Sequence, residues 1–503
     1  MDYEVVIVGG GPVGMLLAAE LALAEVRVCV LERLKETTPY SRALTLHPRS
    51  LELLDMRGWK ADLMNLGQPV HTGHFAALET RLDFSALDSA SNFSLFIPQH
   101  ATERVLEEKA RELGADIRRG VEVVSVQQHE QGMEIGAVSA EGPFSLSAAY
   151  AVGADGAGSL VRKQAGIAFE GTGDTLTAML GDVVLAERSG PGVLSRYTEQ
   201  GLAMIVPLPD GMHRVVVIDP ERTGVPKGEP VTLEELRAAL IRILGSDLGM
   251  CRPYWLSRFG NAARQAAQYR SRRLFLAGDA AHIHFPAGGQ GLNVGLQEAM
   301  NLGWKLAAEL QGRAPAWLLD SYHEERFPVN TELLRNTGVQ TMLMGSEFSP
   351  RMQELRSMLS SLLQIPEANA QLAGGISAFH IRYAPDPAAM PHALNGRRFT
   401  ELKLRLEDGT LRMAYELFHP GRFVLLHLAA DERLERFAQG WRDRHLRVVR
   451  ASAAAAAPDW DGVHTALIRP DGYIAWAVCR SAPEPWEAVR QGLARWCGEP
   501  VTV

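Results

Sequence analysis

The feature that most constrains this chain is a glycine-rich turn near its start, Gly9-Gly10-Gly11-Pro12-Val13-Gly14. The turn lies between an apolar segment predicted as a strand, Glu4–Val8, and a helix predicted over Pro12–Leu23. Its first glycine permits a tight turn, its third lets the backbone approach a pyrophosphate, and its last lets the helix pack against the strand. With a further strand predicted over Arg27–Glu32, the pattern predicts a βαβ unit that binds a dinucleotide.

Glu32 stands at the end of the second predicted strand, eighteen residues after Gly14. A carboxylate at this place would accept hydrogen bonds from both ribose hydroxyls of an adenosine and would disfavour a 2′-phosphate. A glycine turn that joins a strand to a helix without any ligand is the simpler interpretation of the turn alone. The strand, the helix and the terminal acid together favour the nucleotide, but the turn does not separate FAD from NAD.

Three further segments favour FAD. They are Gly153-Ala154-Asp155-Gly156-Ala157-Gly158-Ser159 with Arg162 after it, Gly278-Asp279-Ala280-Ala281-His282 after a strand predicted over Arg273–Ala277, and Pro286-Ala287-Gly288-Gly289-Gln290-Gly291-Leu292-Asn293. Their order and spacing resemble those of the para-hydroxybenzoate hydroxylase-like family of FAD-dependent aromatic monooxygenases, the class A flavoprotein hydroxylases. Within it, the chain is most similar to the branch that acts on aromatic polyketides and related antibiotics.

The resemblance covers the whole chain and implies an α/β fold in several parts. A Rossmann-like FAD-binding domain of the GR2 type would comprise residues 1–70, 99–170 and 268–330, and an interleaved β-sheet substrate domain residues 71–98 and 171–267. A helical linker would follow over 331–392, and a thioredoxin-like domain over 393–503. The segment from Ala466 to Trp476 resembles the hairpin that ends that last domain, which lacks a Cys-x-x-Cys pair and is therefore predicted to be structural or an interface.

The cofactor site is predicted from the glycine turn and from the resemblance together. In the family, Asp279 would accept from the ribityl hydroxyls, the 288–291 run would face the flavin pyrimidine, and Asp155 would support the flavin side and the approach of nicotinamide. The predicted cofactor-binding residues are Gly9, Gly11, Pro12, Val13, Gly14, Glu32, Arg33, Arg42, Gln99, Arg104, Asp155, Gly156, Gly278, Asp279, Pro286, Gly289, Gly291, Leu292 and Asn293.

Each of these residues also has an interpretation without a ligand. Asp279 could cap a helix and Asp155 could close a tight turn, while an isolated arginine or glutamine, such as Arg104 or Gln99, is usually a surface residue. His282 and His284 are expected to support the loop rather than to act as acid–base groups. No metal site is predicted.

The resemblance also implies a mechanism in which the cofactor carries the chemistry. FAD reduced by NADPH or NADH would react with O2 to give a flavin C4a-hydroperoxide, which would hydroxylate an aromatic, polycyclic phenolic substrate near the backbone of Pro286. No catalytic side chain is assigned, and Met204, Val206, Val216 and Val217 would line the pocket or fill the core. A Baeyer–Villiger-type oxygenase, a non-oxygenating flavin reductase or dehydrogenase, and a non-catalytic FAD-binding protein stay open.

Composition excludes some other classes of function. The formal net charge is −8 without a dense basic run, which disfavours nucleic acid and anionic membrane surfaces as partners. No segment approaches the length of a membrane-spanning helix. The four cysteines, Cys29, Cys251, Cys479 and Cys497, are widely spaced, which fits a reducing cytoplasm. We expect a cytoplasmic monomer or homodimer whose partner is a small aromatic molecule.

Overall fold

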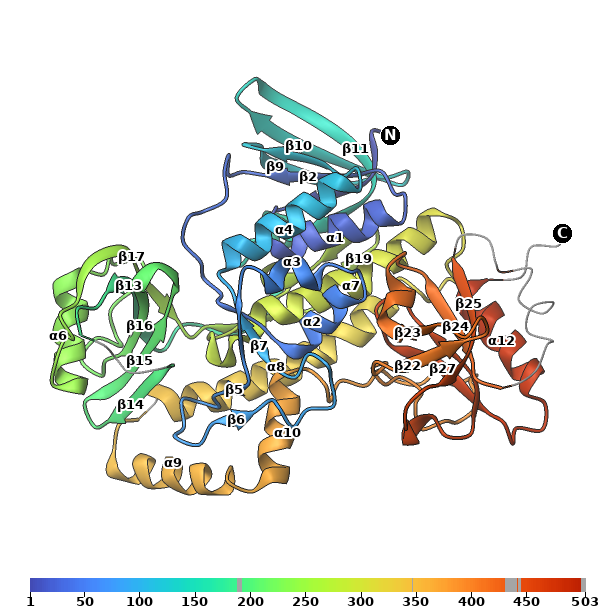
Figure 1. Cartoon of the computed structure of the whole chain (residues 1–503). Helices are drawn as coiled ribbons and strands as arrows, with labels where there is room; N and C mark the ends of the chain where they lie inside the picture. Colours follow the sequence, from blue (N-terminus) through green and yellow to red (C-terminus); the bar gives the residue numbers. More distant parts are fainter. Residues whose placement is uncertain (188–191, 346, 430–440, 442–444, 499–503) are drawn as a thin grey trace.

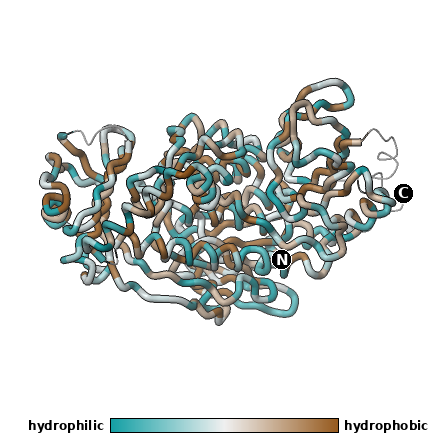
Figure 2. The backbone as a smooth tube through the Cα atoms, turned by 90° about the horizontal axis from the view of Figure 1, so that it is seen from below, coloured by the Kyte–Doolittle hydropathy of each residue, from teal (hydrophilic) through white to brown (hydrophobic). Residues whose placement is uncertain are grey.

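The computed structural model describes residues 1–187, 192–345, 347–429, 441 and 445–498. Three parts lie side by side along the molecule: a central domain, a five-stranded sheet at one end and a C-terminal domain at the other (Figure 1). Hydrophobic stretches run through all three parts (Figure 2), and each part contributes buried apolar residues to a core.

The central domain is built on a sheet whose main strands are parallel. Its order is β19-β20-β11-β1-β2-β8, and the pairs β20/β11, β11/β1, β1/β2 and β2/β8 are parallel, so their carboxyl ends lie along one edge. The bounds are β1 (Tyr3–Val8), β2 (Val28–Glu32), β8 (Asp116–Arg119), β9 (Glu122–Gln128), β10 (Met133–Ser139), β11 (Gly142–Gly153), β19 (Arg270–Ser271) and β20 (Leu274–Leu276). Strands β9 and β10 extend β11 as an antiparallel meander.

Helix α1 (Pro12–Leu23) is apolar on almost every side because two other helices, α4 (Gln99–Glu112) and α7 (Gln290–Leu310), pack against it.

Shorter elements complete this domain and its link to the five-stranded sheet. They are α2 (Pro48–Asp55), α3 (Lys60–Met64), α5 (Leu160–Gln164), β3 (Thr45–Leu46), β4 (Gln68–Val70), β5 (Thr72–Gly73), β6 (Leu82–Asp83), β7 (Ser94–Phe96), β12 (Phe169–Thr172), β18 (Ala263–Ala266) and β21 (His282–Ile283). The 3₁₀ helices among the described residues of the chain are η1 (Pro209–Gly211), η2 (Gly278–Ala280), η3 (Ala287–Gly289), η4 (Ala414–Phe418) and η6 (Pro458–Trp460).

The five-stranded sheet is antiparallel and has two different faces. Its order is β14 (Leu194–Thr198), β15 (Gly201–Pro207), β16 (Met212–Ile218), β13 (Thr177–Val184) and β17 (Cys251–Gly260). Helix α6 (Leu233–Leu244) covers one face and packs on alternate residues, Val217 among them. The other face, here called the inner face, carries Met204 and Val216 and packs against the central domain. Val217 therefore fills the core under α6, and of this pair of neighbours only Val216 is available to line a pocket on the inner face.

Three helices continue the chain beneath the inner face: α8 (Ser321–Gly345), α9 (Pro350–Leu362) and α10 (Pro366–Ile376) (Figure 1). The boundary predicted after residue 330 falls inside α8. The fold class predicted from the sequence, α/β with an FAD-type domain and a C-terminal domain, is confirmed, while the individual domain boundaries stay predictions.

The C-terminal domain is a six-stranded sheet, ordered β23-β22-β25-β24-β26-β27, with one described helix against it. Strands β24 and β25 are parallel, and β26 and β27 form the hairpin predicted between Ala466 and Trp476. The bounds are β22 (Lys403–Leu406), β23 (Leu411–Met413), β24 (Phe423–His427), β25 (Leu446–Ala453), β26 (Val463–Ile468), β27 (Ile474–Cys479) and α12 (Pro485–Cys497). All four cysteines of the chain are free.

The turn of the β26–β27 hairpin inserts into the central domain. The guanidinium of Arg49, which is fully buried on α2, donates to the carbonyl oxygens of Asp471 at 3.0 Å and Gly472 at 3.1 Å. Arg57 donates to the carbonyl of Pro470 at 2.9 Å and pairs with Glu20 on α1 at 2.7 Å. These contacts fix the C-terminal domain to the two N-terminal helices.

Candidate active site

Three loops meet where the parallel strands β1, β11 and β20 end. The amide of Ala154 donates to Val8 O at 2.8 Å, and the amide of Ala277 donates to Gly153 O at 2.9 Å. Gly9 has a left-handed backbone with φ of +107°, and a Cβ at this position would lie 2.3 Å from Ala154 O. Only glycine fits there, and the crevice at the carboxyl ends of such strands is where open α/β sheets bind ligands.

The glycine-rich turn has the geometry of a pyrophosphate site. A Cβ on Gly14 would lie 2.1 Å from Gly9 O, so this glycine is required for close packing of α1 on the turn. A Cβ on Gly11, by contrast, would meet no atom within 4 Å. Gly11 is also the N-cap of α1 and makes no side-chain cap bond, so the helix N-terminus faces open space that suits an anion.

Glu32 is held next to this turn by backbone amides. One carboxylate oxygen accepts from the amide of Gly10 at 2.7 Å, and the other accepts from the amide of Leu34 at 2.8 Å. Each carboxylate oxygen has a second lone pair, so Glu32 keeps the capacity to accept from ribose hydroxyls. Arg33 follows β2 with an exposed side chain.

Asp279 lies at the end of β20 in the second loop. Its side chain is exposed and makes no hydrogen bond to any described residue, so it does not cap a helix. Enough protein nevertheless surrounds it that desolvation raises the pKa of its carboxyl, partly offset by the charges of His282 and Arg42. Asp279 is therefore accessible at the carboxyl end of β20, where it is predicted to accept from ribityl hydroxyls.

Glu298 on α7 supports this loop from below and was not predicted from the sequence. It is fully buried and accepts from the amide of Gly278 at 2.7 Å, from Asn330 at 2.5 Å and from His282 Nε2 at 2.9 Å. His284 Nδ1 lies 2.7 Å from Phe285 O. Both histidines thus support the loop.

The loop before α7 combines an exposed proline with two left-handed glycines. Pro286 is exposed although its neighbours Phe285 and Ala287 are buried. Gly288 and Gly289 have φ of +69° and +65°, and a Cβ on Gly289 would lie 2.6 Å from Thr45 Oγ1. The loop therefore leads into the N-terminus of α7 at Gln290, where free amides can stabilise negative charge on a ligand.

Asn293 and His47 fasten that loop to the central domain. Asn293 accepts from the amide of His47 at 2.7 Å and donates to Gly289 O at 2.9 Å. His47 lies between Ser94 Oγ at 2.8 Å and Gly288 O at 2.7 Å, and burial lowers its pKa to about 4. The ring is thus neutral near neutral pH, with Nε2–H donating to Gly288 O and Nδ1 accepting from Ser94. Sequence patterns gave no indication of this residue.

Arg42 approaches the site from a loop that the five-stranded sheet holds in place. Gln99 accepts from the amide of Ala43 at 3.0 Å, while Arg42 itself is exposed and contributes electrostatically at Asp279. From the inner face, the buried Arg214 donates to the carbonyls of Ser41 and Arg42 and pairs with Asp182 at 2.8 Å. Tyr40 stacks on Trp255 of β17 with ring centroids 4.7 Å apart. We call this set of contacts the Arg214 clamp.

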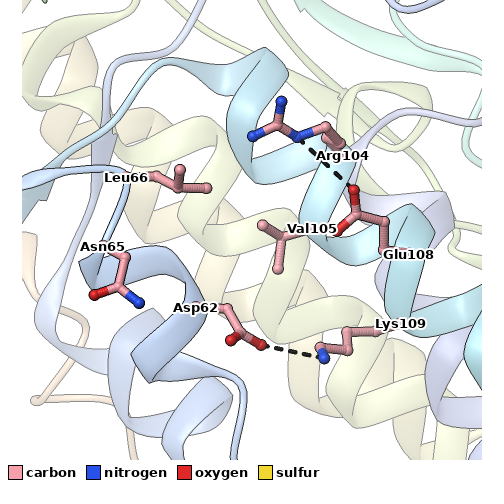
Figure 3. A pocket seen from close by; sticks show the side chains of 7 residues that line it. All are labelled: Asp62, Asn65, Leu66, Arg104, Val105, Glu108 and Lys109. Atoms are coloured by element: carbon pink, nitrogen blue, oxygen red, sulfur yellow. Dashed lines mark ion pairs between the residues drawn. The ribbon is translucent and has the colours of Figure 1, made fainter.

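Arg104 is not brought to this site by any contact between described residues. It lies on α4 with a side chain that is 61% exposed, and its Nε is 3.9 Å from Glu108. Figure 3 shows it at the edge of a shallow surface pocket between α3 and α4, where Lys109 pairs with Asp62 at 3.1 Å. Its contact with FAD stays a prediction.

The Asp155 loop joins the other two loops. Its carboxylate accepts from Ser159 Oγ at 2.5 Å and from the amide of Val161 at 3.2 Å, which closes the turn before α5. Arg162 then donates to Ala280 O at 2.7 Å, in the loop that carries Asp279. Asp155 therefore sets the backbone of its loop, and a contact of its own with flavin or nicotinamide stays a prediction.

The fold and these loops define a flavin-type dinucleotide-binding protein. The open space at Gly11, the accessible Asp279 and the exposed Pro286 are the places where the pyrophosphate, the ribityl chain and the ring system of FAD are predicted to bind. Within the described ranges, no group of acidic, histidine or cysteine side chains could hold a metal ion. No helix in the same ranges is long and apolar enough to cross a membrane.

Comparison with known proteins identifies the family. A model of the FAD binding domain matches residues 2–337, and a model of the C-terminal domain of aromatic-ring hydroxylases matches residues 392–500. The chain belongs to this family of FAD-binding aromatic-ring hydroxylases. The predicted FAD-dependent monooxygenase class is thereby confirmed.

Individual relatives are similar over nearly their full length. YhjG of Bacillus subtilis, an uncharacterized aromatic compound monooxygenase, is 53% identical over 99% of this chain and 98% of its own. The 12-dehydrotetracycline 5-monooxygenase/anhydrotetracycline 6-monooxygenase of Streptomyces rimosus is 43% identical over 99% of this chain and 100% of its own. The solved structure of OxyS anhydrotetracycline hydroxylase, also from Streptomyces rimosus, superposes with a TM-score of 0.91 at 42% identity and covers 100% of both chains.

Proposed function

We propose that this protein uses NADPH or NADH and O2 to hydroxylate a polycyclic phenolic substrate, of the kind found among aromatic polyketides. The observation that carries the proposal is that buried apolar side chains of the inner face pack against the residues that flank the exposed Pro286. Leu202, Met204 and Ile218 of the sheet share one buried cluster with Phe285 and Ala287 of the loop. An apolar environment next to this loop suits flat aromatic rings.

The residues around the Pro286 loop have separate tasks. Bound FAD would pass electrons from NADPH or NADH to oxygen and so activate it, and the chain therefore needs no nucleophile of its own. The apolar cluster excludes water, and the ring of Phe259 packs against it with its centroid 5.4 Å from that of Phe285. The N-terminus of α7 stabilises negative charge on its ligand, and the Arg214 clamp holds Arg42 beside Asp279.

The test follows the absorbance of bound flavin under anaerobic conditions after addition of NADPH or NADH, with and without a panel of polycyclic phenols and quinones. Bleaching that one ligand accelerates, followed in air by a product heavier by one oxygen atom, supports the proposal. Equal bleaching with every ligand, with hydrogen peroxide as the only product, would favour a reductase. Flavin that binds but never bleaches would leave only a cofactor-binding role.

The mass and NMR spectra of the product separate two oxygenase outcomes. A new phenolic hydroxyl indicates hydroxylation, whereas an ester or lactone indicates a Baeyer–Villiger reaction at a ketone. A cytoplasmic location and a monomeric or homodimeric state stay predictions.

A further inference from the structure

A strained turn lies beside the inner face, between β5 and β6. Ala76 and Ala77 are consecutive and both have left-handed backbones, with φ of 49° and 51°. Residues other than glycine rarely adopt this conformation, and two in succession persist only where the surroundings enforce it. Backbone strain of this kind gathers at functional sites, so the turn directs attention to the side chains that it presents.

Four hydrogen bonds enforce the turn. The amide of Ala76 donates to Gln340 of α8 at 3.1 Å, and the amide of Ala77 donates to His74 Nδ1 at 3.2 Å. The carbonyl oxygens of Ala76 and Ala77 accept from the buried guanidinium of Arg356 on α9 at 3.0 and 2.8 Å. All four polar backbone groups of the two alanines are therefore bonded to side chains, and one of those side chains is His74.

The turn fixes the tautomer of His74. Because Nδ1 accepts from Ala77, the ring proton is on Nε2, which has no acceptor among the described residues. Burial, with smaller contributions from Arg81 and His47, lowers the pKa of His74 to about 4, so the ring is a neutral donor near neutral pH. Its side chain is only half-buried, although Phe75, Ala76 and Ala77 beside it belong to the apolar cluster under the inner face.

Arg81 brings an uncompensated positive charge next to His74, because the pairing of Thr72 with Asp83 and of Gly73 with Leu82 places these two residues at facing positions of the hairpin. Its guanidinium is half-buried and donates to the backbone carbonyl of Val193 at 3.1 Å and to Ser195 Oγ at 3.3 Å, beside and on strand β14. The nearby acids Glu79 and Asp83 are exposed and form no ion pair with it in the described chain. A cation without a carboxylate next to a neutral N–H donor matches an anionic oxygen better than a neutral one.

We propose that His74 and Arg81 form a subsite for an ionised oxygen of the substrate, a phenolate or an enolate, with His74 Nε2–H donating to that oxygen. The inference rests on the proposed function, because it specifies which phenols that site accepts. The apolar cluster binds the rings of the substrate, and this subsite favours substrates that carry a negatively charged oxygen. A substrate whose acidic hydroxyl is methylated keeps the rings and loses both interactions.

The test uses the FAD-loaded protein without NADPH or NADH and measures binding only. Alizarin, an anthraquinone whose phenolic anion absorbs at longer wavelength than flavin, is compared with its dimethyl ether in a mildly acidic buffer where free alizarin is neutral. We expect the wild-type protein to bind alizarin more tightly than the ether and to raise the anion band. His74→Leu should weaken alizarin binding about tenfold to hundredfold, the loss of one charge-assisted hydrogen bond, and leave the ether unchanged.

Two further variants separate the subsite from general damage. His71→Leu, at an exposed histidine in the same segment, should leave both affinities unchanged. Arg81→Gln should lose the anion band, and Arg81→Lys should keep part of it because the charge remains. Equal binding of alizarin and its ether, no binding of alizarin, or an unchanged anion band in both His74→Leu and Arg81→Gln would overturn the inference. All of these outcomes concern binding without NADPH or NADH, so none of them decides whether a ligand accelerates flavin bleaching, which is the result on which the proposed function depends.

Discussion

Two regions of the molecule are held together in different ways. Around the glycine-rich turns, here called the cofactor side, backbone atoms make the close contacts. Across the inner face of the five-stranded sheet, here called the substrate side, side chains make them. On the cofactor side, Gly9 and Gly14 lie against carbonyl oxygens so closely that no side chain fits. On the substrate side, the buried pair of Arg214 and Asp182 and the stacked Tyr40 and Trp255 hold the Arg42 loop. The backbone contacts on the cofactor side tolerate no side chain at these glycines. The side-chain contacts on the substrate side can be altered one residue at a time while the fold persists.

The largest effect should come from the cofactor side. Gly14→Ala places a Cβ 2.1 Å from Gly9 O, and we expect a loss of more than about 5 kcal/mol in the free energy of unfolding. Gly11→Ala is the matched control, because its Cβ meets no atom within 4 Å. Its apoprotein should keep its stability within about 0.5 kcal/mol while FAD binds more weakly. Thermal unfolding of the apoproteins measures the stability of both variants, and FAD titration measures their affinity for the cofactor. Unaltered FAD affinity in Gly11→Ala would show that the pyrophosphate does not bind at Gly11.

The substrate side predicts a smaller, coupled effect. Arg214→Gln leaves the Asp182 carboxylate buried without its partner, which costs about 3–5 kcal/mol. The double variant with Asp182→Asn should recover part of this loss, with a coupling energy of about 0.5–3 kcal/mol in urea unfolding. Both variants should also reduce the acceleration of flavin bleaching by ligand, since the Arg42 loop is released. Strictly additive losses would show that the two residues do not act together.

His47 predicts how the flavin loop responds to acid. Its folded pKa of about 4 lies below the ordinary value of 6.5, so its contribution to stability is complete above the ordinary value and is lost as the pH falls toward the folded one. The loss amounts to about 3 kcal/mol over that window. His47→Gln should flatten this part of the pH dependence of unfolding, whereas His71→Gln, at an exposed site, should not. Identical acid profiles in wild type and His47→Gln would contradict the placement of His47.

Arg104 should give the smallest effect. Its exposed side chain and long contact with Glu108 predict that Arg104→Ala changes stability by less than about 0.5 kcal/mol. FAD titration of this variant then tests whether Arg104 contacts FAD, as the family resemblance implies, or lies outside the cofactor site, as its exposed position indicates. A clear loss of affinity would extend the cofactor site along α4, and unchanged affinity would mean that on this side of the site the contacts end at Gln99 and the 41–43 loop.

The same contrast explains which parts could be predicted from the sequence. The helix over Pro12–Leu23 has the bounds that the sequence predicts, because the glycine turn before it and the helix-forming residues within it are local properties. The glycine motifs could be predicted because a close backbone contact admits one residue type. His47 bonds to a carbonyl 241 residues away, and Asp182 to an arginine 32 residues away. No local pattern records such pairs, and His74 acquires its tautomer only from a strained turn that α8 and α9 enforce.

The inserted hairpin turn has a consequence for how the protein is made. Arg49 and Arg57 leave the ribosome early, yet the carbonyl groups that they bind belong to residues 413 to 423 positions later in the chain. Until those residues emerge, the two guanidinium groups have only their nearby acids, Glu52 and Glu20, as ionic partners. The N-terminal helices therefore reach their final packing only after nearly the entire chain has been synthesised. In a nascent chain that is halted before the hairpin, the surface around Arg49 and Arg57 stays accessible to chaperones and proteases.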